Sequence, residues 1–217
     1  MSESDSFIDE VTEEVRRDKL FAFFRRYAWA GVALVALVVG GTAWVEWRKH
    51  VTGAQAEAFG DAIVAASAGA DAEARAKALA SVPVKGPEAT VLSQILAAEQ
   101  LASGDRAAAV AALDAVAGTD GYPARMRMLA RLKSVLLQGA EMDPAARDAA
   151  LAELAAPGAP FRVLAMEQQA MVLVAAGKRD EAIALLRQLL QDADATQALR
   201  ARVGQLMVAL GADPAAA

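Results

Sequence analysis

Cysteine is absent from this chain of 217 residues, and histidine occurs once, at His50. Without cysteine the chain has no disulfide, no thiolate zinc site and no thiol nucleophile, and the redox state of its compartment is left open. His50 has no second histidine with which to complete a metal site or a nucleophile pair. Phosphate-binding glycine loops, dinucleotide motifs and nucleophile elbows are lacking too. These absences predict a protein that is not an enzyme and that needs no cofactor or metal.

Basic charge in excess and strand-like patterning are also lacking. The net charge of −5 argues against nonspecific binding of nucleic acid. Aromatic residues make up 5% of the chain, and apolar and polar residues do not alternate as they do in strands. The acidic residues are expected at helix starts or on solvent faces, where they favour the helix dipole rather than catalysis; they include Asp105, Asp114, Asp180, Glu181 and Asp192. We therefore expect an all-α protein whose partners are proteins, not nucleic acid or a small-molecule substrate.

One long apolar run is present near the N-terminus. Residues 28–45 carry no charge, and a helix of that length is about long enough to cross a bilayer core of roughly 30 Å. Tyr27 and Trp29 lie at one end of the run, and Trp44 and Trp47 lie at the other, as expected for rings at the two membrane interfaces. The sequence predicts a transmembrane helix over residues 28–47.

Basic residues predict the orientation of this span. Only Arg48 and Lys49 closely follow it, whereas five basic residues closely precede it: Arg16, Arg17, Lys19, Arg25 and Arg26. The positive-inside rule then places residues 1–27 in the cytoplasm and the remainder in the periplasm of a bacterium, with the span in the inner membrane. Two alternatives are a cleaved signal peptide, with a small-residue site at Gly41-Thr42-Ala43, and a buried helix of a soluble protein. The length of the apolar run and the long acidic segment before it favour the anchor.

Two features of the N-terminal part suggest contacts. Residues 1–27 form a cytoplasmic amphipathic segment with an apolar face of Phe7, Ile8, Val11 and Val15, which either rests on a surface or is simply a solvated tail that sets the topology. Within the span, small residues at steps of three and four form one stripe that would let another helix pack closely, although an alanine-rich helix also produces such stripes by chance; they are Ala33, Ala36, Gly40 and Ala43.

Glycines and prolines recur with a regular period after the span. Gly69, Gly104, Gly139 and Gly177 are 35, 35 and 38 residues apart, and each follows an apolar helical stretch, as a C-terminal cap does. Pro87, Pro123 and Pro160 are 36 and 37 residues apart, near the starts of helices. The period of about 36 residues predicts helical hairpins in series.

Two of the turns align without a gap. The ten residues from Gly104 and the ten from Gly177 share a pattern of glycine, arginine, alanine, a β-branched residue, alanine and leucine. Small residues where helices cross, with leucine on the buried face, are typical of a tetratricopeptide-like repeat, although the usual aromatic positions are absent. We predict a tetratricopeptide-like α-solenoid of about four hairpins over residues 48–211; the alternative is an irregular alanine-rich bundle.

The C-terminal end of the solenoid is predicted from apolar spacing. A helix over residues 196–210 would cap the solenoid with Leu199, Val203, Leu206 and Leu210 on its buried face. Residues 212–217 have no apolar pattern and are expected to form a disordered tail.

Two groups of residues are candidates for partner binding, both on the first helices of hairpins. Four basic residues could meet an acidic segment of a partner, and methionines suit adaptable apolar recognition of unfolded polypeptides. A solvated face and core filling, respectively, are the alternatives. The candidates are Arg125, Arg127, Arg131 and Lys133 with Met126 and Met171.

The order of segments resembles a known bacterial family. The resemblance rests on Asp9–Leu20 (DEVTEEVRRDKL), the exit Trp44-x-x-Trp47-Arg48, Leu154–Arg162 (LAAPGAPFR) and Leu199–Leu206 (LRARVGQL). Together these are similar to the ancillary SecYEG translocon subunit family. The resemblance implies a periplasmic repeat domain tethered beside the SecYEG translocon, where it works with a membrane-bound periplasmic chaperone on emerging polypeptides. A scaffold of another envelope complex, in cell division or cell-wall assembly, would share the same layout.

Overall fold

The computed structural model describes residues 3–214, and the side chains of Arg25 and of residues 29–214. Within this range the chain is all-helical and has no strand, which confirms the predicted fold class. The elements are α1 (Glu3–Ala66), α2 (Ala72–Ala80), α3 (Glu88–Ala102), α4 (Arg106–Ala117), α5 (Ala124–Gln138), the short 3-10 helix η1 (Gly139–Glu141), α6 (Pro144–Leu154), α7 (Arg162–Ala175), α8 (Arg179–Gln191) and α9 (Gln197–Ala209).

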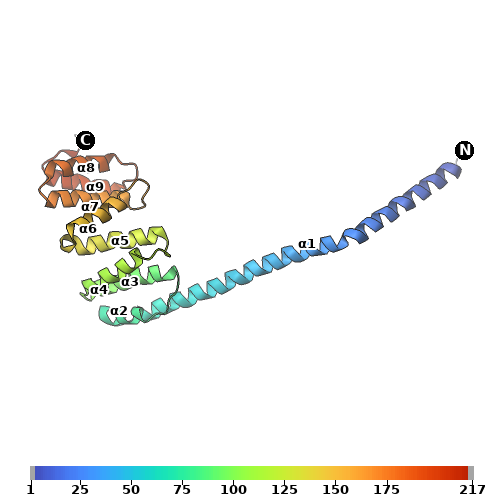
Figure 1. Ribbon diagram of the computed structural model, residues 1–217, viewed down its shortest axis with the longest axis horizontal. Coiled ribbons are helices and arrows are strands. Elements are labelled where there is room, and N and C mark those ends of the chain that lie inside the picture. The colour runs from blue at the N-terminus through green and yellow to red at the C-terminus, as the bar shows by residue number, and fades with distance from the viewer. Residues whose placement is uncertain (1–2, 215–217) are drawn as a thin grey trace. The chain divides into compact units, whose positions relative to one another are not determined.

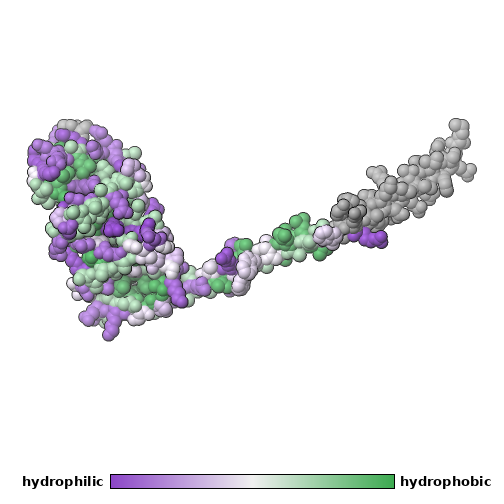
Figure 2. All heavy atoms as spheres, in the orientation of Figure 1, coloured by the Kyte–Doolittle hydropathy of each residue, from purple (hydrophilic) through white to green (hydrophobic). Residues whose placement is uncertain are grey.

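Helix α1 is longer than the predicted span at both ends. It runs from Glu3 to Ala66 without a break, and from Trp29 onward it is long and apolar enough to cross a membrane. Figure 2 shows apolar side chains gathered along this helix, and none of its apolar window is buried. The apolar face expected within residues 1–24 lies outside the described side chains. The chain divides into two units after Gly60: the first lies within α1, and the second contains the last residues of α1 and all the later helices.

Helices of the second unit pack mainly against their neighbours in sequence (Figure 1). The hairpins α3–α4, α5–α6 and α7–α8 follow one another, and α9 closes the series. Three clusters of buried residues each join one hairpin to the helix that follows it; they include Leu113, Leu151 and Leu186. A core that is built from nearest neighbours is the defining property of a solenoid.

Three glycines end helices in the left-handed conformation. Gly104, Gly177 and Gly211 have φ of +86°, +74° and +73°. After each, the next backbone N–H donates to a carbonyl five residues back, as from Asp105 to Gln100 at 2.8 Å and from Lys178 to Leu173 at 2.9 Å. These bonds satisfy carbonyls that the helix end leaves unpaired. The cap roles predicted for Gly104 and Gly177 are therefore confirmed.

The cap role predicted for Gly69 is wrong. Its φ is not positive, so it does not take the left-handed conformation of a cap. A Cβ atom there would lie 3.0 Å from Cγ and 3.1 Å from the backbone N of Arg75, and Arg75 donates to the Gly69 carbonyl at 3.3 Å. Gly69 thus allows a close approach of the chain to α2, whose N-cap is Asp71.

The two aligned segments occupy equivalent positions in α4 and α8. Ala109 and Ala182 are both fully buried, and Leu113 and Leu186 are 1% and 0% exposed. The small alanines lie where neighbouring helices approach, and the leucines fill the core one turn later. This arrangement confirms the repeat register that the sequence predicts.

Enlarging either buried alanine should force the helices apart. We expect Ala109→Leu and Ala182→Leu each to destabilise the fold by about 1–3 kcal/mol, because a packed core has no room for added methyl groups. Arg106→Leu and Lys178→Leu are matched controls on exposed positions and should change stability by less than about 0.5 kcal/mol. Thermal unfolding followed by circular dichroism measures both sets, and equal melting temperatures would contradict the register.

The C-terminal end is packed more fully than its sequence pattern indicates. Leu199, Val203 and Met207 are the buried residues of α9, whereas Leu206 and Leu210 are only partly buried. Ala212 also packs on this cluster and donates its N–H to the Met207 carbonyl at 2.9 Å, so the packed chain extends past the start of the expected tail. Residues 215–217 of that tail lie outside the described part of the chain.

Two acidic residues expected on solvent faces instead hold helices together. Asp114 on α4 accepts a hydrogen bond from the buried Ser134 hydroxyl of α5 at 2.6 Å. Asp192, after α8, receives both terminal nitrogens of Arg162 at 2.7 Å, and Asp194 receives one of them at 2.8 Å. Sequence spacing does not predict either pair, because the partners lie 20 and 30 residues apart.

The Arg162–Asp192 pair predicts how stability depends on pH. Hydrogen bonding from Arg162, and secondarily from the Asp194 backbone N–H, lowers the pKa of Asp192 from its ordinary value. Its contribution to stability is therefore complete above the ordinary aspartate pKa of about 3.9 and is lost as pH falls through the lower folded value. The melting temperature of Asp192→Asn should lie below that of the wild type at neutral pH, and the gap should close below about pH 4. A gap that stays constant down to pH 2 would contradict the assignment.

Candidate protein-interaction surface

First helices of successive hairpins form two grooves of similar make-up. The α3–α5 groove has a volume of about 220 Å³ and is lined by Gln94, Ala97, Ala98, Leu101, Leu113, Lys133, Leu136 and Leu137. The α5–α9 groove has a volume of about 420 Å³ and is lined by Leu132, Leu136, Leu164, Glu167, Gln168, Met171 and Arg202. Leu136 belongs to both, so the grooves adjoin along α5.

A 35-residue period relates the groove positions. Leu101, Leu136 and Met171 are successive members of one series and are 43%, 47% and 46% exposed. Gln94 on α3 and Leu164 on α7 are two periods apart, and each lines one of the two grooves. Exposed apolar side chains that recur along one face of a solenoid form a continuous surface for a polypeptide partner.

Polar groups occur at defined points of both grooves. Glu167 receives Nε and a terminal nitrogen of Arg202 at 2.9 and 2.8 Å, which ties α7 to α9 at the groove edge. In the α3–α5 groove, Lys133 forms no ion pair with any described residue. The amide of Gln94 is buried and has no hydrogen-bond partner within residues 29–214.

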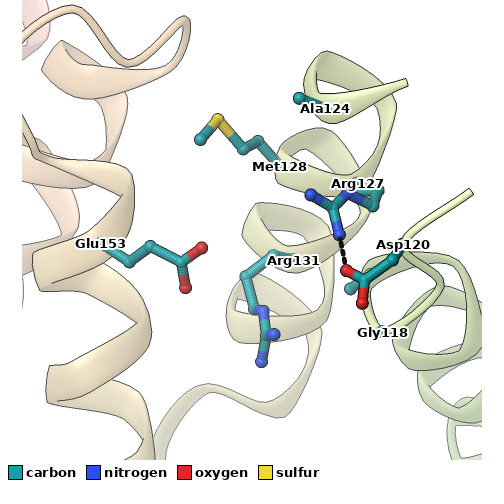
Figure 3. A pocket seen from close by; sticks show the side chains of 8 residues that line it. Gly118, Asp120, Ala124, Arg127, Met128, Arg131 and Glu153 are labelled. Carbon is teal, nitrogen blue, oxygen red and sulfur yellow. Dashed lines mark hydrogen bonds and ion pairs between the residues drawn. The ribbon is translucent and has the colours of Figure 1, made fainter. Parts of the chain in front are cut away.

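A separate polar pocket of about 290 Å³ lies between the α4–α5 turn, the first half of α5, and α6 (Figure 3). Arg127 and Arg131 reach into it from α5, and Glu153 faces them from α6. Arg127 pairs with Asp120 at 2.5 Å, yet its Nε is buried and has no partner among the described residues. Arg131 forms no hydrogen bond or ion pair there, although it is partly buried. We call this the arginine pocket.

The structure distributes the predicted basic cluster over different parts of α5. Arg127 and Arg131 line the arginine pocket, whereas Lys133 lines the α3–α5 groove. Arg125 is exposed and Met126 is partly buried, and neither lines the pocket or the grooves. Arg127 and Lys133 are six residues apart and therefore point about 120° apart around the helix, since successive residues turn by about 100°. The four basic residues therefore do not form one surface.

Other predicted residues are placed as follows. Met171 lies in the α5–α9 groove. The small residues of α1 are exposed, and none of the apolar window that contains them is buried; they are Ala33, Ala36, Gly40 and Ala43. Sequence reasoning missed Leu101, Leu136 and Gln94, and the 35-residue recurrence of Leu101, Leu136 and Met171 is the signal that could have found the first two.

Comparison with known proteins gives one family. A family model described as a tetratricopeptide repeat-like domain matches residues 22–210, which is most of the chain. No curated protein and no solved structure matches it.

Proposed function

Because this chain belongs to the tetratricopeptide repeat-like family, we propose that it is a membrane-anchored module that binds a polypeptide partner along its first-helix grooves. The observation that carries the proposal is the run of exposed Leu101, Leu136 and Met171 across the two grooves. Repeat domains of this kind are protein-interaction modules, and nothing in the described residues points to catalysis.

Anchoring is supported by the exposed apolar part of α1. The apolar part of this helix has no buried residue, and apolar side chains left in water are costly. The rings of Trp44 and Trp47 lie 5.3 Å apart at the end of the apolar run, next to Arg48 and Lys49. An aromatic pair beside basic residues fits the interface of a bilayer. We place residues 28–47 in the bacterial inner membrane, residues 1–27 in the cytoplasm and residues 48–211 in the periplasm.

The partner that we propose is the SecYEG translocon together with a membrane-bound periplasmic chaperone. Support comes from the resemblance in segment order and motifs, and from grooves whose exposed aliphatic side chains suit segments of translocated polypeptides that are not yet folded.

Affinity purification of the full chain from mild detergent tests this role. Recovery of SecY or the chaperone in near-stoichiometric amount is the expected result. Leu136→Glu places a charge in both grooves and should sharply reduce recovery of the chaperone or client polypeptides. Val208→Glu is the control, since Val208 is 63% exposed and lines neither groove. Recovery of division or peptidoglycan-synthesis proteins instead would assign the chain to another envelope complex.

A further inference from the structure

The arginine pocket and the Arg162 clamp are related by the 35-residue period. Arg127 and Arg162 are 35 residues apart in α5 and α7, and so are the buried Ala130 and Ala165, each 0% exposed. Each arginine therefore has the same register in its hairpin. The two hairpins therefore hold a guanidinium at the same position, and its surroundings differ between them.

In the α7–α8 hairpin, the chain itself supplies the anion. Arg162 is held by the carboxylates of Asp192 and Asp194, at 2.7 and 2.8 Å, from the segment that follows α8. In the α5–α6 hairpin, the corresponding segment after α6 is Ala155-Ala156-Pro157-Gly158 and carries no acid. No carboxylate thus reaches Arg127 from that side, and the pocket is open instead.

The open pocket has more donors than acceptors. Asp120, from the preceding turn, pairs with one terminal nitrogen of Arg127, while Nε of Arg127 has no partner. Arg131 adds a second guanidinium that forms no hydrogen bond or ion pair within the described part of the chain, and Figure 3 shows its side chain extending along α5 away from that of Arg127. A carboxylate is the group that best satisfies the fork of guanidinium donors, through two parallel bonds.

Glu153 is the charge that opposes such a ligand. It faces the pocket from α6 but is exposed and forms no ion pair with Arg131. Its effect on an incoming anion is therefore a screened repulsion across the pocket, whereas a guanidinium that lines the pocket can pair with the anion at contact distance.

We propose that the arginine pocket binds an aspartate or glutamate side chain of a protein partner, which takes the place that Asp192 occupies in the next hairpin. The inference rests on the proposed function as a protein-interaction module, and it adds a second contact point to the apolar grooves. It also selects partners that carry an exposed acidic residue.

Fluorescence anisotropy with the full chain in detergent tests the pocket. The probes are two labelled octapeptides of glycine and serine with two central glutamates or two central glutamines. The glutamate peptide should bind at least about tenfold more tightly, as one charge-assisted bidentate contact implies. Arg131→Gln and Arg127→Gln should each remove most of this preference, whereas Arg125→Gln, on the exposed side of the same helix, should leave it unchanged. Glu153→Gln should strengthen binding of the glutamate peptide a few-fold.

The arginine Nε–H NMR signal of Arg127 gives an independent readout, because it should shift when the glutamate peptide is added. Equal affinity for the two peptides, or an equal loss in Arg125→Gln and Arg131→Gln, would overturn the proposal. Displacement of the peptide by equimolar inorganic phosphate would assign the pocket to phosphate and overturn it too. A chain that recovers the translocon but binds neither peptide would refute the pocket and leave the proposed function standing. A chain that binds the glutamate peptide but does not recover the translocon would support the pocket and refute the translocon role.

Discussion

Replacing Leu186 with alanine should destabilise the repeat domain by about 2–5 kcal/mol, a large part of the roughly 5–15 kcal/mol that keeps a natural domain folded. Leu186 is 0% exposed and lies in the cluster that joins α7, α8 and α9, where Ile183, Leu189 and Val203 surround it. Truncation removes the apolar contact and leaves a cavity that the rigid helices close only in part. Urea unfolding of the full chain in detergent, followed by the helical signal, measures the change.

Two further variants make this result specific. Gln188→Ala alters an exposed position of the same helix and should change stability by less than about 0.5 kcal/mol. Leu113→Ala removes the equivalent leucine of α4, which is 1% exposed, and should cost about as much as Leu186→Ala. Since a solenoid is stabilised by contacts between neighbours, Leu186→Ala should loosen the C-terminal hairpins first. An unchanged urea midpoint in Leu186→Ala would contradict the packing described here.

Local signals in the sequence were sufficient to predict the hairpins. Gly104 and Gly177 end helices because glycine alone takes positive φ without a steric cost, and this property depends on no distant contact. Pro87 and Pro123 directly precede α3 and α5, where the missing N–H costs nothing. The buried alanines followed from a matched pattern over ten residues. In each case the signal lies within a short stretch of consecutive residues.

Contacts between hairpins could not be predicted in the same way. Whether Asp192 lies in solvent or against Arg162 depends on where the segment after α8 returns, which no spacing in the sequence specifies. Arg131 lines the arginine pocket, whereas Lys133 lines the α3–α5 groove. The two residues are only two positions apart in the sequence, but helix rotation turns their side chains about 200° from each other. Gly69 fits the 35-residue spacing of the cap glycines, but it does not cap a helix. It allows a close approach to Arg75 instead, and the spacing alone could not show this difference.

Alkaline phosphatase fused after Gly211 should be active, and the same enzyme fused after Arg25 should be inactive. The enzyme is a reporter of the periplasm because it needs disulfides that form there and not in the cytoplasm. Five basic residues closely precede the apolar part of α1 and two closely follow it, so translocation of the C-terminal side is favoured. The expected contrast is close to all-or-none, since a single span has only two orientations. Green fluorescence from a fusion after Gly211, with an active phosphatase after Arg25, would reverse the topology.

Moving the basic residues tests the cause of this orientation. Changing Arg16, Arg17 and Lys19 to glutamine leaves Arg25 and Arg26 before the span and Arg48 and Lys49 after it, so the charge bias disappears and a mixed population of both orientations is expected. An N-terminal epitope tag separates the anchor from a cleaved signal peptide in the same cells. A retained anchor keeps the tag on the full-length chain, whereas cleavage after Ala43 would release it and leave a shorter periplasmic product. Because the grooves face a translocated polypeptide only if the repeat domain is on the same side of the membrane, a cytoplasmic C-terminus would remove the translocon role along with the topology.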